Sequence, residues 1–438
     1  MLKKMKSRSF LVMMAFLLAL MTACSGKGSD QASGDNNASA KDGNKIELTF
    51  WNIWTDPSPQ IEASKKQVEA FMKEHPNIVI KQQNIPHDQY KVKVKTQAAG
   101  KQLPDLIQVW PGAELKPLVD GKLIQPIDDM LSHWSDLLPE EKLGDYRMNG
   151  KQYALPGSIT PTSLVYYDKD ILKNVGYDEF PNTYEEFKKL IAKLNDKKII
   201  PIALGNKAQW ILQSSYISTI GDRLTGDQFL SSVLDSGDKK FTDEKFIQAV
   251  KVIKELADLK AFNEDFNSID NVQHRDLFVL GEAAMMIDGA WSLGPLLKDA
   301  PDKNVGIAVF PKVEGGEGDP AAVSAVSGTG IALNSELKGE KLKAAQEFFE
   351  YFYSKEYFTE LLKANVLVPA NIEPPAGISP LLKEVSKLVS HKLVPVYDAT
   401  LPTNVTDILN TGLQEVTLGT MSPEELAEKL QKAVDKQK

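Results

Sequence analysis

Strand-like and helix-like segments alternate along the chain from residue 45 onward. Residues 46–51 alternate apolar and polar side chains, as a strand with one buried face does. Ser58 followed by Pro59 then predicts the start of a helix, because serine caps a helix and proline suits its first turn. Further strands are predicted at 78–80 and 105–110. This order predicts an α/β fold, a sheet with helices on its faces.

The same order recurs in the second half of the chain. Thr183 and Glu186 have the spacing of a capping box and precede a predicted helix. Residues 199–204 and 283–287 read as buried strands, and Ser422 starts the last helix. We therefore expect two α/β lobes.

The N-terminal segment has the features of an export signal. Four basic residues precede the apolar run 10–20, which is shorter than the roughly 17–25 residues that span a bilayer. Small residues then precede Cys24, as in the bacterial lipobox, although Met21 stands where that motif prefers leucine. We expect cleavage of residues 1–23 and lipidation of Cys24. An ordinary secretory leader with an incidental cysteine is the alternative.

Residues 24–44 are expected to form a flexible tether, since after Cys24 they contain no apolar side chain larger than alanine. The chain carries a formal charge of −8, and removal of four basic residues with the leader takes it to −12. An acidic mature protein argues against nucleic acid as a partner. No other cysteine is present, so no intrachain disulfide is expected.

Tryptophans follow four of the predicted strands, at Trp54, Trp110, Trp210 and Trp291. In an open α/β sheet, ligands bind beyond the carboxyl ends of the strands. A pyranose offers one apolar face and a rim of hydroxyls, which suits an indole with carboxylates or amides nearby. The polar candidates beside these tryptophans are Asp56, Gln108, Glu114 and Asn206. Each tryptophan taken alone is more often a core residue.

Several motifs in sequence order resemble the family 1 extracellular solute-binding lipoproteins, relatives of maltose-binding protein that serve carbohydrate ABC importers. They are the lipobox and residues 50–54, 103–106, 153–156, 164–170 and 284–291. The resemblance implies two lobes with a sugar in the cleft, and the four stacking candidates suggest an oligosaccharide over a monosaccharide. The resemblance also implies ABC permease subunits as partners and a monomer anchored by lipid to the extracellular face of a bacterial cell membrane, of Gram-positive type.

Site residues and lobe boundaries also follow from the resemblance. Trp291 resembles the family's C-lobe stacking tryptophan, Thr160 lies near the first crossover, and Gly328 belongs to a small-residue segment that approaches the ligand. The expected N-lobe comprises 45–157 and 304–365, and the expected C-lobe 158–303 and 366–438.

An enzyme is the main alternative class. A secreted glycosidase also combines tryptophans with two carboxylates, and Asp56 with Glu114 would fill those roles. However, the five histidines form no metal-binding pair, and no nucleophile elbow or P-loop occurs. We therefore expect neither catalysis nor a cofactor or metal. A binding protein for a non-sugar solute and a surface adhesion protein are the remaining alternatives.

Overall fold

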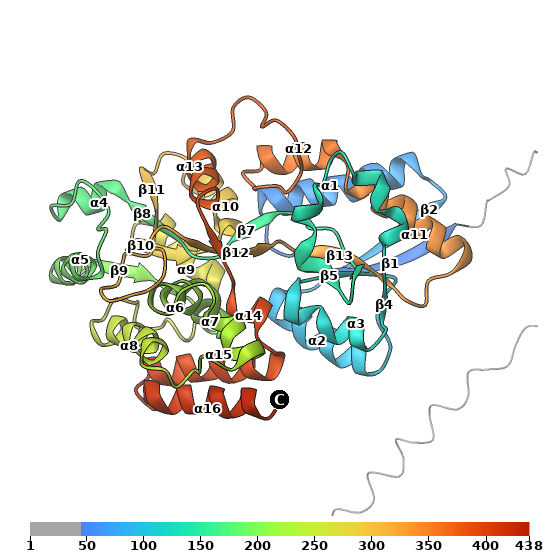
Figure 1. Cartoon of the computed structure of the whole chain (residues 1–438). Helices are drawn as coiled ribbons and strands as arrows, with labels where there is room; N and C mark the ends of the chain where they lie inside the picture. The colour runs from blue at the N-terminus through green and yellow to red at the C-terminus, as the bar shows by residue number, and fades with distance from the viewer. Residues whose placement is uncertain (1–44, 438) are drawn as a thin grey trace, which may run out of the picture. The chain divides into compact units, whose positions relative to one another are not determined.

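The computed structural model describes residues 45–437 (Figure 1). The predicted leader, Cys24 and the tether lie outside these residues. The described chain has the predicted α/β architecture, with two separate main sheets. We call the parts built around them the N-lobe and the C-lobe. Within residues 45–437, no helix is long and apolar enough to cross a membrane.

The N-lobe sheet has the strand order β2-β1-β3-β13-β4. Its strands are β1 (Ile46–Asn52), β2 (Ile78–Asn84), β3 (Leu106–Val109), β4 (Ile124–Gln125) and β13 (Gly330–Asn334). The first three are mutually parallel, and β13 returns antiparallel beside β3. A small hairpin of β5 (Arg147–Met148) and β6 (Lys151–Gln152) lies apart from this sheet.

Helices cover both faces of the N-lobe sheet (Figure 1). They are α1 (Pro59–Glu74), α2 (His87–Ala99), α3 (Lys116–Asp120), α11 (Gly339–Phe352) and α12 (Lys355–Lys363). Successive strand residues point to opposite faces, so Leu106 joins the core under α1 and α11, whereas Ile107 joins the core under α3. The predicted start of α1 is confirmed, because the Ser58 side chain accepts a hydrogen bond from the amide of Ile61.

The C-lobe sheet has the order β11-β8-β10-β9. Its strands are β8 (Leu164–Asp168), β9 (Ile200–Ala203), β10 (Ala283–Asp288) and β11 (Val305–Val309). Every residue of β10 is buried, as the sequence predicts. β11 lies within the segment 304–365 that the sequence assigns to the N-lobe, yet it pairs antiparallel with β8. We therefore propose that the chain returns to the N-lobe at residue 323 rather than at 304.

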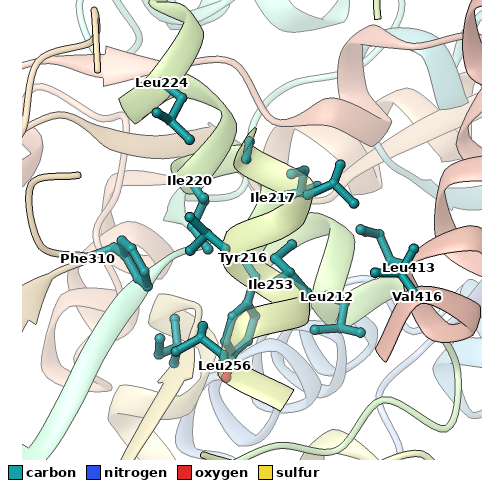
Figure 2. Close-up of a cluster of buried hydrophobic side chains, with 14 of the residues drawn as sticks. Leu212, Tyr216, Ile217, Ile220, Leu224, Ile253, Leu256, Phe310, Leu413 and Val416 are labelled. Carbon is teal, nitrogen blue, oxygen red and sulfur yellow. The ribbon is translucent and has the colours of Figure 1, made fainter. Parts of the chain in front are cut away.

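Eleven α-helices belong to the C-lobe among the described residues. They are α4 (Lys169–Asn174), α5 (Tyr184–Asp196), α6 (Ser218–Thr225), α7 (Phe229–Ser231), α8 (Glu244–Asp258), α9 (Asn271–Val279), α10 (Leu293–Asp299), α13 (Pro380–Val389), α14 (Tyr397–Thr400), α15 (Thr403–Thr417) and α16 (Pro423–Asp435). Figure 2 shows their core, in which Leu212 and Ile217 of a π-helical turn lie between Ile253 of α8 and Leu413 of α15. The single cysteine allows no intrachain disulfide, so we expect this core to supply the stability of the C-lobe.

The lobes are connected through a third sheet, ordered β14-β12-β7. β7 (Ile159–Pro161) leads into the C-lobe, and β12 (Val323–Ser327) leads back toward β13. β14 (Leu393–Val394) pairs with the start of β12. A later pass of the chain also joins this region, because the amide of Ile159 donates to the carbonyl of Leu367 (2.9 Å).

Candidate functional site

Aromatic side chains from both lobes meet at the carboxyl ends of the strands. We call His87, Trp110, Trp210 and Trp291 the aromatic cluster. The ring centroid of His87 lies 5.4 Å from that of Trp110 and 5.3 Å from that of Trp210. Trp210 in turn lies 5.6 Å from Trp291. His87, at the start of α2, therefore connects an N-lobe tryptophan to the two C-lobe tryptophans.

A hydrogen bond holds His87 in place, and burial keeps its imidazole neutral. Its Nδ1 lies 2.9 Å from Oδ1 of Asp88, whose side chain also accepts a hydrogen bond from Trp210. Burial lowers the pKa of His87, and the hydrogen bond with Asp88 opposes that effect only in part. The hydrogen bond from His87 lowers the pKa of Asp88, so this carboxylate is ionised at neutral pH. The result is a neutral acceptor and donor group between the indoles of the two lobes.

Lys91 and Glu114 form an ion pair beside Trp110. The Lys91 Nζ lies 2.6 Å from Glu114 Oε1 and 4.9 Å from the centroid of the Trp110 ring. Burial disfavours the charged ammonium group, but the attraction of Glu114 and Asp398 outweighs it and raises the pKa of Lys91. Both side chains keep about a quarter to a third of their surface exposed. Their charges are therefore available to hydroxyl groups.

The C-lobe contributes a buried carboxylate, Asp398 of α14, to this set. The Gln213 amide accepts from the Asp398 backbone N–H (2.9 Å) and donates to its Oδ2 (3.2 Å). Burial raises the pKa of Asp398 to about 6, although Lys91 opposes the shift. The Asp398 carboxylate therefore interacts electrostatically with Lys91 and Glu114 of the N-lobe.

Asp56, a predicted ligand residue, instead contacts the other lobe. Its Oδ2 lies 3.4 Å from the Nη2 atom of Arg275 in α9. Among residues 45–437, Asp56 is the only charged partner of Arg275. The Arg275 side chain is only 5% exposed, against 31% for Asp56, and its Nε has no hydrogen-bond partner in the described chain. This pair is one of the charged contacts between the lobes.

Three further predicted residues make contacts inside their own lobe. Trp54 is 6% exposed and stacks on Phe352 of α11 with ring centroids 6.1 Å apart, so it lies in the N-lobe core. Gln108 is buried, accepts from the amide of Ile53 and donates to Thr329. Asn206 is also buried, donates to Asn267 and accepts from the amide of Leu212. Each of these polar groups already has partners within the protein.

Thr160 lies on β7, and Gly328, which directly follows β12, lies close to it. A Cβ at Gly328 would lie 1.8 Å from Ser158 Oγ and 2.8 Å from Thr160 Oγ1, so a larger residue there would force these hydroxyls to move. The Gly328 amide donates to the carbonyl of Ser158 (2.7 Å). The observed close approach is thus between crossing strands.

The structure therefore brings Trp110, Glu114, Trp210 and Trp291 to one region, and leaves Trp54, Gln108 and Asn206 outside it. His87, Lys91 and Asp398 lie beside these residues in the candidate site and were not predicted from the sequence. His87 follows β2 by three residues, so applying the strand-end rule to β2 as well as to the tryptophans would have found it.

Asp398 carries no comparable signal in the sequence, because its neighbour Lys91 lies about 300 residues away. No group of three or more His, Cys, Asp or Glu side chains within residues 45–437 has an arrangement suited to a metal ion.

Residues 57–357 match the family model described as bacterial extracellular solute-binding protein. The multiple sugar-binding protein of Streptococcus mutans is 25% identical over 354 residues, which are 76% of this chain and 74% of that protein. The melibiose/raffinose/stachyose-binding protein of Bacillus subtilis is 22% identical over 433 residues, 96% of this chain and 95% of that one. The structure of a chitin oligosaccharide binding protein superposes with a TM-score of 0.83 at 26% identity, covering 90% of this chain and 99% of that one.

Proposed function

Because this chain belongs to the bacterial extracellular solute-binding protein family, we propose that it captures an oligosaccharide between its lobes and delivers it to an ABC importer in the membrane. The chain is a binding protein, not an enzyme. The aromatic cluster carries the proposal: three tryptophans and a neutral imidazole from two lobes meet at the strand ends, beside three ionisable groups. Flat apolar rings with carboxylates at their edges are what successive pyranose units require.

Each residue has a distinct proposed role. Trp110, Trp210 and Trp291 stack on sugar rings, while Glu114, Lys91 and Asp398 exchange hydrogen bonds with hydroxyls. Asp56 acts at the contact between the lobes, because it pairs with Arg275. The pairing of Asp56 and Glu114 with two different cations also argues against their joint use as a glycosidase acid and nucleophile.

Binding is proposed to act through a conformational equilibrium. A ligand that contacts both lobes stabilises only the closed arrangement, so it shifts the population toward that form. The importer then distinguishes closed from open protein. Similarity to sugar-binding proteins from two bacteria supports an oligosaccharide as the ligand class.

Thermal unfolding in the presence of single sugars tests the ligand class. Melibiose, raffinose, stachyose and N-acetylated chitin oligosaccharides are the first panel, followed by calorimetric titration of any sugar that stabilises the protein. A native-state ligand raises stability by about 2.7 kcal/mol at 100 times its Kd. If amino acids or peptides stabilise the protein and no sugar does, the carbohydrate assignment is wrong.

The proposed attachment is a lipid on Cys24. The Cys24→Ala variant should appear in the culture medium, whereas the wild-type protein should remain with the cell membrane and incorporate labelled palmitate. Equal membrane retention of both forms would contradict lipidation at this position.

A further inference from the structure

A buried carboxylate, Asp288, ends β10 directly before the turn that carries Trp291. It accepts hydrogen bonds from Nε2 of His274 (3.1 Å), from Oγ of Ser292 (2.6 Å) and from the amide of Gly289 (2.9 Å). The side chains of His274, Asp288 and Ser292 have no exposed surface. Three donors thus compensate the carboxylate for its loss of water.

The other nitrogen of His274 binds a different loop. Its Nδ1 accepts the backbone N–H of Gly205 (2.9 Å), which directly follows β9 and Leu204. An acceptor nitrogen carries no proton, so the ring proton lies on Nε2 and is donated to Asp288. One imidazole therefore connects the loop after β9 to the loop after β10.

Both connected loops lead to tryptophans of the aromatic cluster. Gly205 precedes Trp210 by five residues, Asp288 precedes Trp291 by three, and the two indoles contact each other. The Trp291 ring also lies directly against Gly289, where a Cβ would come within 2.1 Å of it. The Tyr166 hydroxyl donates to the Gly289 carbonyl (3.0 Å) and so holds the same turn in place.

We infer that His274 is a positioning residue that fixes Trp210 and Trp291 relative to each other in the proposed sugar site. The inference depends on the proposed function only for its effect on affinity. An imidazole is suited to this role because its rigid ring presents an acceptor and a donor at a fixed separation. Alanine at this position would leave Asp288 with two donors and the Gly205 amide without an acceptor, both in a buried region.

His274 is not required to hold α9 itself. The start of α9 is fixed by a capping box, in which Asp270 accepts from the amide of Gln273 and the Gln273 side chain accepts from the amide of Asp270. One turn further along α9, the buried Phe278 ring anchors the helix in the hydrophobic core that contains Met286 of β10. The two ring nitrogens of His274 instead bind the tryptophan loops.

Fluorine NMR of protein labelled with 5-fluorotryptophan tests this role without any ligand. The chain has six tryptophans, so six signals are expected, and Trp210→Phe and Trp291→Phe assign the two that matter. His274→Ala should shift or broaden both of these signals and leave the other four in place. Phe278→Leu, a core variant on the same helix, is the matched control and should leave Trp210 and Trp291 unchanged.

Two conservative variants separate the two bonds and remain informative if His274→Ala does not fold. An asparagine can replace the acceptor toward Gly205, so His274→Asn should mainly disturb Trp291. A glutamine can replace the donor toward Asp288, so His274→Gln should mainly disturb Trp210. The inference is overturned if neither signal moves in any His274 variant, or if Phe278→Leu causes the same changes.

Sugar affinity provides the second measurement. Loss of one or two buried hydrogen bonds should weaken the binding of the best sugar by about tenfold in His274→Ala. Unchanged affinity together with unmoved signals rejects the positioning role. If the wild-type protein binds no sugar at all, the proposed function fails, while the fluorine spectra still decide whether His274 positions the two indoles.

Discussion

A tryptophan side chain at the end of a strand either turns back onto its own lobe or projects beyond the sheet, and its packing partners decide which. Trp54 turns back, because Phe50 and Phe352 offer it an edge-on and a stacked ring. Trp291 projects, because Gly289 leaves room for its ring and Trp210 meets it. The indole Nε1 of Trp291 has no hydrogen-bond partner within residues 45–437, although it is buried.

Truncation of Trp291 to alanine should weaken sugar binding by about 10- to 100-fold, because the buried face of the ring is worth about 1.5–3 kcal/mol. The unfolding midpoint should change little, and calorimetric titration checks the affinity.

Trp54→Ala is the matched control for Trp291→Ala. It should lower the free energy of unfolding by about 3–5 kcal/mol, because it empties part of the core. Unchanged affinity in Trp291→Ala would remove this residue from the proposed site.

Asp398 gives the site a pH-dependent stability. Since burial raises its pKa to about 6, above its ordinary value, its contribution is favourable at low pH and is lost as the pH rises through about 6. Asp398→Asn mimics the protonated form, so it should stabilise the protein by about 1–3 kcal/mol at pH 8 and have little effect at pH 4. Chemical unfolding at both pH values measures this. Equal effects at pH 4 and pH 8 would contradict a raised pKa.

At the scale of single elements, helix starts depend on a few neighbouring residues. The last helix, α16, begins at Ser422, whose hydroxyl accepts from the amide of Glu425 while the Glu425 carboxylate accepts from the amide of Ser422. Thr183 likewise caps α5. The carboxylate of Glu186, expected to complete that capping box, instead pairs with Lys189 at 2.7 Å.

Ser422→Ala should therefore lower the free energy of unfolding by about 0.5–2 kcal/mol, the usual cost of a lost N-cap. Denaturant unfolding followed by circular dichroism measures it. Ser390→Ala, at the C-terminal end of α13, is the control, because its hydroxyl caps no helix start. Equal losses in the two variants would show that capping does not account for the effect.

Local sequence signals predict most of the helices and strands, but they predict few of the contacts between these elements. Ser58 and Ser422 could be recognised because a cap acts on residues within one turn. The place of β11 could not, since it depends on pairing with β8, more than 130 residues earlier. Similarly, the strand-end position does not separate Trp54 from Trp110, because each follows a strand and contacts with distant residues, such as Phe352 for Trp54, help to decide how deeply each is buried.

At the scale of the whole described chain, several charged contacts join the lobes. Arg275 to Asp56 is the most buried of them, whereas Lys298 to Glu62 and Lys95 to Asp407 are exposed. The Arg275 guanidinium, which is 5% exposed, has no other carboxylate partner among residues 45–437 and loses this one if the lobes separate. Its burial therefore favours the closed arrangement more than an exposed pair does.

Asp56→Asn should increase the open population and weaken ligand binding by about tenfold, because it leaves the buried Arg275 without a counter-charge. Energy transfer between dyes on one introduced cysteine per lobe measures the population, in a Cys24→Ser background that leaves no other thiol.

Glu62→Gln is the control for Asp56→Asn, since Glu62 and Lys298 are about half exposed and water replaces their contact. If both variants change the open population equally, the Asp56–Arg275 pair has no special role.

The crossover sheet has a mechanical consequence. β7 and β12 are bonded to each other through the register of Thr160 with Val326, and the Leu367 segment is bonded to β7. Gly328 and Ser158 fix how closely two of these passes lie. Three crossing segments that are bonded side by side allow the lobes to rotate about one axis, and they resist twisting and sliding of one lobe against the other. The lobes should therefore meet in the same relative position on every closure. The residues that each lobe contributes to the proposed site then return to the same alignment.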